Sequence, residues 1–172
     1  MRNLLKLFAV VLIILAASTV KSQQKFGHID LQALVQTMPE RATAETAFNK
    51  FQKELEDLLG EMSKEYQGKL AELEQLQKDT TTSELKRNAK ITDLQEMQVK
   101  MDNFRNSAQQ QLQSKQAELL NPVFQKAEKA IEDVAKEGGL LYVFDVSSKV
   151  VLYKSNQSID MLPLVKTKLG IK

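Results

Sequence analysis

The chain has 172 residues, carries a formal net charge of +2, and contains one histidine and no cysteine. This composition leaves few side chains for a nucleophilic or metal site and none for a disulfide, so we expect no catalytic residue, no metal and no cofactor. Aromatic residues make up only 6% of the chain, which argues against a large globular core and favours stability through helix packing or assembly.

Residues 1–22 have the three-part pattern of a secretory signal peptide. Arg2 and Lys6 precede the apolar run LFAVVLIILAA, and small residues follow it up to Ser22. The run is shorter than the roughly 20 residues that span a bilayer, so we expect cleavage and export, with a retained membrane anchor as the alternative. Residues 23–172 then carry 21 basic and 22 acidic residues. This near neutrality argues against a nucleic-acid partner held by bulk charge.

The next residues predict two short elements. Residues 25–31, KFGHIDL, are typical of a short strand, and Asp30 is a candidate cap for a short helix that follows. The apolar face of that helix would consist of Leu31, Leu34, Val35 and Met38. The single histidine, His28, is interpreted as a structural residue because no second metal-ligand type accompanies it.

A long helix is predicted from the segment TMPER to about Lys78. Thr37 and Glu40 have the spacing of a capping box, and Pro39 is tolerated in a first turn. The following apolar residues are spaced by alternating steps of four and three, which is the heptad seam of a coiled coil. They are Ala44, Phe48, Phe51, Leu55, Leu58 and Met62.

The segment DTTTSEL, residues 79–85, interrupts this helix, and Thr81 with Glu84 forms a second candidate capping box. A second helix then runs to Gly138-Gly139, with Pro122 inside it as an expected bend. Its seam includes Leu94, Met97, Met101, Phe104, Ala108, Leu112, Leu119, Val123, Ala127, Ile131 and Val134. Because the connection is short, the two helices are predicted to pack antiparallel as one arm.

Residues 140–153 predict a β-hairpin, with LLYVFDV and VVLY as its strands, and Asp160 is a candidate cap for a terminal helix. So few strands cannot shield both faces and both edges of a sheet. We therefore expect copies of the chain to pool their strands into one shared core. The residues expected in this core are Phe26, Ile29, Leu141, Val143, Val146, Val151 and Tyr153.

The order of these parts resembles the Skp/OmpH family of periplasmic chaperones. The resemblance rests on FGHIDLQALVQTMPE, on LLNPVFQKAEKAIEDVAKEGGLLYVFDVSSKVVLYKS and on IDMLPLVKTKL, with the long helical hairpin between the first two. It implies an α+β fold in which a long antiparallel coiled-coil hairpin projects from a small β body that trimerises into a shared barrel. It divides the chain into a signal peptide, 1–22, and one chaperone domain, 23–172, with the body in 23–42 and 120–172 and the helical arm in 43–119.

The resemblance also implies a function: an ATP-independent periplasmic holdase that keeps unfolded outer-membrane β-barrel proteins in a cavity between helical arms. We expect contact with such a client at apolar residues along the arm, namely Leu59, Met62, Tyr66, Leu76, Ile91, Met97, Val99 and Phe104. Lys86, Arg87 and Lys90 beside the arm's turn are candidates for contact with an anionic lipid or lipopolysaccharide surface. The alternative for these three cations is an ordinary solvated helix face.

Two other functional classes stay open at this stage. A structural coiled-coil spacer or tether of the cell envelope would use the same arms and would need no cavity for clients. An enzyme is the least supported class, because paired carboxylates such as Glu54 and Asp57 have no convergent partner in the pattern.

Overall fold

The computed structural model describes residues 24–148 and 150–171. Their contacts form two compact units, one made of residues 33–129 and the other of residues before Ala33 together with those after Lys129. The elements follow in the order β1 (Phe26–Ile29), α2 (Leu31–Thr37), α3 (Pro39–Lys78), α4 (Glu84–Gly138), β2 (Tyr142–Asp145), β3 (Ile159–Asp160) and α5 (Leu162–Lys168). Among the described residues, no helix is both long enough and apolar enough to cross a membrane. The expected signal peptide lies outside the described residues.

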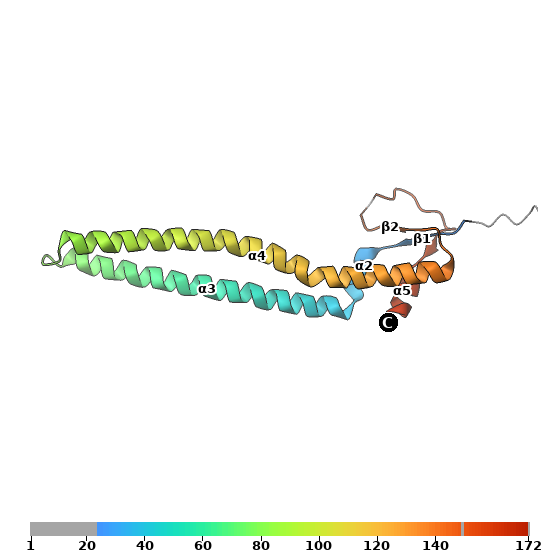
Figure 1. Ribbon diagram of the computed structural model, residues 1–172, viewed down its shortest axis with the longest axis horizontal. Helices are drawn as coiled ribbons and strands as arrows, with labels where there is room; N and C mark the ends of the chain where they lie inside the picture. Colours follow the sequence, from blue (N-terminus) through green and yellow to red (C-terminus); the bar gives the residue numbers. More distant parts are fainter. Residues whose placement is uncertain (1–23, 149, 172) are drawn as a thin grey trace, which may run out of the picture. The chain divides into compact units, whose positions relative to one another are not determined.

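The two long helices form an antiparallel hairpin, as the heptad patterns predict. Figure 1 shows α3 lying beside the first part of α4, with a tight connection between them. Helix α3 has 40 residues and is therefore about 60 Å long. Two ion pairs join the helices, one from Glu40 to Lys126 and one from Glu72 to Lys90. The start of α3 therefore lies beside a later part of α4, and the end of α3 lies beside the start of α4, as in any antiparallel pair. The ammonium group of Lys115 lies 5.8 Å from the centre of the Phe51 ring between these two pairs.

The helix starts differ from the two predicted capping boxes. Helix α3 follows Met38, which makes no side-chain cap, while the Thr37 hydroxyl donates to the carbonyl of Leu34. Helix α4 starts after Ser83, whose carbonyl accepts from the amides of Lys86 and Arg87. The Thr81 hydroxyl instead donates to Asp79 at 2.6 Å. Both capping predictions were wrong. The Thr37 hydroxyl binds the carbonyl of Leu34, and the Thr81 hydroxyl binds the carboxylate of Asp79.

The end of α4 follows the prediction from Gly138-Gly139. Gly139 has a φ of +63°, and the amide of Leu140 donates to the carbonyl of Ala135 at 2.9 Å. This is the glycine-terminated C-cap in which a left-handed residue reverses the chain. Pro122 lies inside α4 as expected.

The predicted hairpin at 140–153 was wrong. Strand β1 is the centre of a three-stranded sheet of order β2-β1-β3, and both neighbours run parallel to it. Among the described residues, β2 has no partner on its outer edge, and residues 150–155 form no strand. The Asp145 carboxylate accepts hydrogen bonds from the amide and hydroxyl of Ser147, which turn the chain at the end of β2. The third strand of the sheet is therefore the two-residue β3, which the alternation of apolar residues does not reveal.

One face of this sheet packs on the terminal helix. Met161 and Val165 are fully buried, and Ile29 is nearly so. A methyl group placed on Gly27 would lie 3.0 Å from Cγ of Met161, so only glycine allows this approach of strand and helix side chains without displacement. The predicted role of Asp160 as a cap for α5 is confirmed, because its carboxylate accepts from the amide of Leu162 at 3.0 Å.

Candidate functional site

The arm packs tightly at its two ends and loosely in its middle. Near the turn, Leu73 of α3 and Leu94 and Met101 of α4 are buried. At the other end, Ala44 and Val123 are buried. Within the described chain, no α3 residue between Ala44 and Leu73 and no α4 residue between Met101 and Val123 is buried. The middle of the arm therefore keeps part of its apolar seam accessible.

Three hollows lie along this loosely packed part. Their volumes are about 240, 430 and 530 Å³, and each is lined by both helices. Apolar groups of the seam line them together with polar and charged side chains, among them Glu45, Lys100 and Lys115. The apolar lining residues are Phe48, Leu119 and Leu120 in the first hollow, Phe51 in the second, and Leu58, Met62 and Phe104 in the third.

The predicted client-contact residues fall into three groups. Val99 is 59% exposed and Ile91 is also exposed, so both are available on the outside of the hairpin. Half-buried positions are taken by Leu59, Met62, Tyr66, Leu76 and Phe104. Met97 is only 5% exposed and packs in the seam of α4, so it cannot meet a client while the hairpin is closed.

Three exposed apolar residues of the arm, Leu58, Leu70 and Leu85, are absent from the predicted client-contact residues, and Leu58 was expected in the seam. Leu85 is 81% exposed in the first turn of α4, beside the connection between the helices. It stands outside the heptad seam and directly after Glu84, and a single leucine on a polar helix is usually incidental. Its exposure could not be foreseen without the position of the Ser83 cap.

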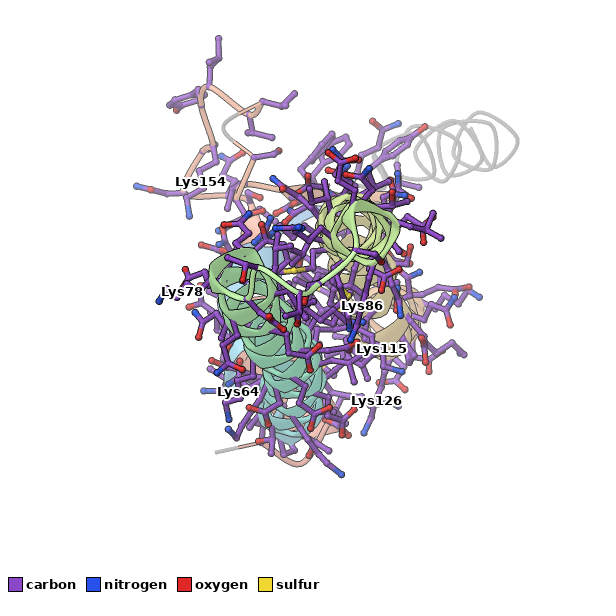
Figure 2. The ribbon with its side chains drawn as sticks, turned by 90° about the vertical axis from the view of Figure 1, so that its left-hand side faces the viewer. Lys64, Lys78, Lys86, Lys115, Lys126 and Lys154 are labelled. Carbon is purple, nitrogen blue, oxygen red and sulfur yellow. The ribbon has the colours of Figure 1, made fainter. Side chains whose placement is uncertain are left out.

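The connection at the end of the arm uses two of the three predicted lipid-contact cations for its own structure. The Arg87 guanidinium donates to the carbonyl of Thr82 at 2.6 Å, and Lys90 pairs with Glu72 at 2.7 Å. The hydrogen bond from Lys90 lowers the pKa of the Glu72 carboxyl below its usual value. Figure 2 looks along the arm from this end and shows Lys78 and Lys86 on the two helices beside the connection.

Aromatic side chains cover one face of the sheet. The rings of Phe26, Tyr142 and Phe144 lie with their centres 6.2–6.3 Å apart, across the β1–β2 register. All three are exposed, as are Leu141 and Tyr153 from the predicted shared core. Val143, Val146 and Val151 are half-buried, whereas Ile29 is buried within its own chain. An exposed aromatic ladder on a strand whose outer edge has no partner among the described residues is a surface suited to association.

The comparison with protein families decides the identity. The family model described as Outer membrane protein (OmpH-like) matches residues 25–169, which is nearly the whole described chain. The chain belongs to the OmpH-like family. This is a family of periplasmic chaperones that bind outer-membrane proteins. A search of curated proteins finds no match to the chain.

The fold supports this family membership. Its strands and its two long helices paired as a hairpin are consistent with an OmpH-like protein. All three sequence blocks on which the resemblance rests fall within the matched residues.

Proposed function

We propose that the protein is an ATP-independent periplasmic holdase that binds unfolded outer-membrane β-barrel proteins and prevents their aggregation. The observation that carries the proposal is the long α3–α4 hairpin, whose apolar residues are accessible in its middle and on its outer side. Many weak apolar contacts along such an arm suit clients of varied sequence, because no single pocket must fit one side chain. Membership of the OmpH-like family supports the kind of client.

We further propose that three copies assemble through the sheet. The support is the exposed aromatic ladder of Phe26, Tyr142 and Phe144 together with the outer edge of β2, which has no partner among the described residues. The exposed apolar segment Val150–Tyr153 extends the same surface. In a trimer, three arms would surround a cavity lined by residues such as Leu59, Ile91 and Val99. Export by the N-terminal segment would bring the chain to the periplasm.

Contact with an anionic lipid or lipopolysaccharide surface is a weaker proposal. Arg87 and Lys90 already have partners at the end of the arm, which leaves Lys86 of α4 and Lys78 of α3, beside the connection, to attract such a surface. Two cations on exposed helix ends contribute only modest attraction at physiological salt. The function proposed above does not depend on this contact.

Light scattering tests the holdase proposal. An outer-membrane barrel unfolded in urea is diluted into buffer with the protein lacking residues 1–22, and aggregation is followed. We expect suppression at a ratio of one trimer to one client. Deleting residues 50–115 should abolish protection while leaving the assembly intact. A truncation before Gly139 should lose the assembly, because the sheet then lacks β2 and β3.

The envelope spacer or tether is the alternative that these experiments separate. A spacer would show a stable assembly with no effect on client aggregation, and its arms would be dispensable for any binding to unfolded chains. Full protection by the variant without residues 50–115 would contradict the role proposed for the arms. No suppression by the intact protein would contradict the holdase function itself.

A further inference from the structure

His28, the only histidine of the chain, is buried at the centre of the sheet. It is 7% exposed and lies in β1 on the same face as the aromatic ladder, opposite Phe144 on one side and Asp160 on the other. Both ring nitrogens have partners from the segment before β3. Nδ1 lies 2.9 Å from the hydroxyl of Ser158, and Nε2 lies 2.8 Å from the Lys154 ammonium.

The lysine contact is compatible with one tautomer of the neutral ring. An ammonium group can only donate, so Nε2 must be the unprotonated nitrogen and Nδ1 must carry the hydrogen. The Nδ1 hydrogen is then directed at the Ser158 hydroxyl. A protonated imidazole would offer Lys154 a second donor and a like charge at 2.8 Å, and this arrangement cannot persist.

The two contacts lie at the end of a segment that has little else holding it to the body. In Val150–Lys154, Leu152 is 96% exposed, and no backbone amide of these residues donates a hydrogen bond within the described chain. Between the segment and the sheet is a cavity of about 610 Å³. Its lining includes Phe26, His28, Phe144, Val151, Tyr153 and Ile159.

We infer that His28 is an acid-sensitive latch: its neutral ring holds Lys154 and the segment Val150–Gln157 on the sheet, and protonation of the ring releases them. Histidine is the side chain whose charge ordinarily changes between pH 5 and 8, and this chain has no second one. Release would open the cavity that lies between the segment and the sheet. This regulation goes beyond the proposed holdase function, because it is a property of the body within one chain.

The other charged groups near the ring do not replace Lys154. The Asp160 carboxylate opposite His28 accepts from the amide of Leu162, which commits it to the start of α5. Lys25 and Tyr153 line the same cavity, but no hydrogen bond joins either to the ring among the described residues. From β2, the residue in register is the uncharged Phe144, while the neighbouring Asp145 binds the amide of Leu31 and Ser147.

The test measures the position of the segment directly. Because the chain has no cysteine, spin labels can be attached at Leu152→Cys and Lys166→Cys, and their distance distribution recorded by pulsed electron paramagnetic resonance. Labelled chains are diluted with unlabelled ones so that only distances within one chain contribute. We expect a narrow distribution at about pH 7.5 that is lost at about pH 5.

Three variants separate the latch from a general effect of acid. His28→Gln keeps an acceptor that does not protonate, so its distribution should stay narrow at both pH values. Lys154→Met removes the donor and should give the broad distribution at both. Lys25→Met, the matched control in the same cavity, should behave like the wild type. A narrow Lys154→Met distribution at about pH 7.5, or a pH response in His28→Gln equal to that of the wild type, would overturn the inference.

A second measurement needs no substitution. Nitrogen-15 spectra of the single histidine should show a hydrogen on Nδ1 and none on Nε2 at about pH 7.5. A ring with its hydrogen on Nε2 would contradict the latch even if every variant failed to fold. Light scattering with an unfolded client is independent of both readouts, so loss of the latch and loss of the holdase function are distinguishable.

Discussion

Replacing Gly27 by alanine tests the packing of sheet and terminal helix. The added methyl group would lie 3.0 Å from Cγ and 3.3 Å from Sδ of Met161, and 3.2 Å from Cδ1 of Leu140. Met161 is fully buried, so its side chain has little room to yield. The backbone of Gly27 does not have a positive φ, and the cost is therefore steric. Overpacking of this kind costs about 1–3 kcal/mol of the free energy of unfolding.

The same substitution elsewhere in the chain should have the opposite sign. Gly60 and Gly68 lie inside α3, and a methyl group added at either meets nothing within 4 Å. Alanine there should stabilise by about 0.5–1 kcal/mol, because glycine is the poorer helix former. Urea unfolding followed by circular dichroism, at one fixed protein concentration, compares all three variants with the wild type.

A double-mutant cycle makes the test specific. In a Met161→Ala background the obstructing side chain is absent, so Gly27→Ala should cost clearly less than it does in the wild type. An unchanged cost in that background would refute the steric account. Equal or greater stability of the single variant Gly27→Ala would refute it as well.

Two further predictions concern charge and chain reversal. Burial alone would raise the pKa of Asp145, but hydrogen bonds from Ser147 and from the amide of Leu31 outweigh it and lower the pKa below 3.8. The carboxylate therefore contributes stability that is present above about pH 3.8 and is lost as the pH falls through its folded-state pKa. Asp145→Asn should cost about 1–2 kcal/mol at neutral pH and show a smaller loss on acidification, and an acid titration of stability that matches the wild type would disprove this. Gly139→Ala should lower the free energy of unfolding by about 1–2 kcal/mol because of the positive φ. Gly139→Asn should lower it less, and equal thermal stability of the two variants would count against the left-handed cap.

Sequence patterns predicted the helices well because those patterns are local. The alternating steps in α3 and α4 depend on residues within one turn of each other, and the seam residues Leu94, Met101 and Val123 are buried as expected. Met97 shows a limit of using the seam pattern to predict client contacts. Its place in the seam predicts burial, and that burial removes it from the surface that a client can reach.

The errors concern contacts between residues far apart in the chain. The first amide of α2, that of Leu31, donates to the carboxylate of Asp145, 114 residues away, and no local pattern in the sequence indicates this contact. Strand β3 has two residues and pairs in parallel with β1, so no periodicity announces it. The sequence favoured pairing of LLYVFDV with the nearby VVLY. In the structure β2 pairs instead with β1, which lies far away in the chain.

The candidate surfaces were foreseeable only in part. Apolar residues off the seam, such as Ile91 and Val99, could be assigned to the outside of the arm from helical geometry. The partners of Arg87 and Lys90 could not be predicted from the sequence, because they depend on how the connection folds and on which α3 residue faces α4. The environment of His28 likewise depends on where the segment after β2 returns to the sheet.

Native mass spectrometry of the protein mixed with an unfolded outer-membrane barrel tests the central claim most directly, since it weighs the assembly and the client together. We predict one dominant complex of three chains and one client, and three chains alone when no client is added. A chain that remains a monomer, or a trimer that acquires no client mass at concentrations where the barrel alone aggregates, would contradict the account.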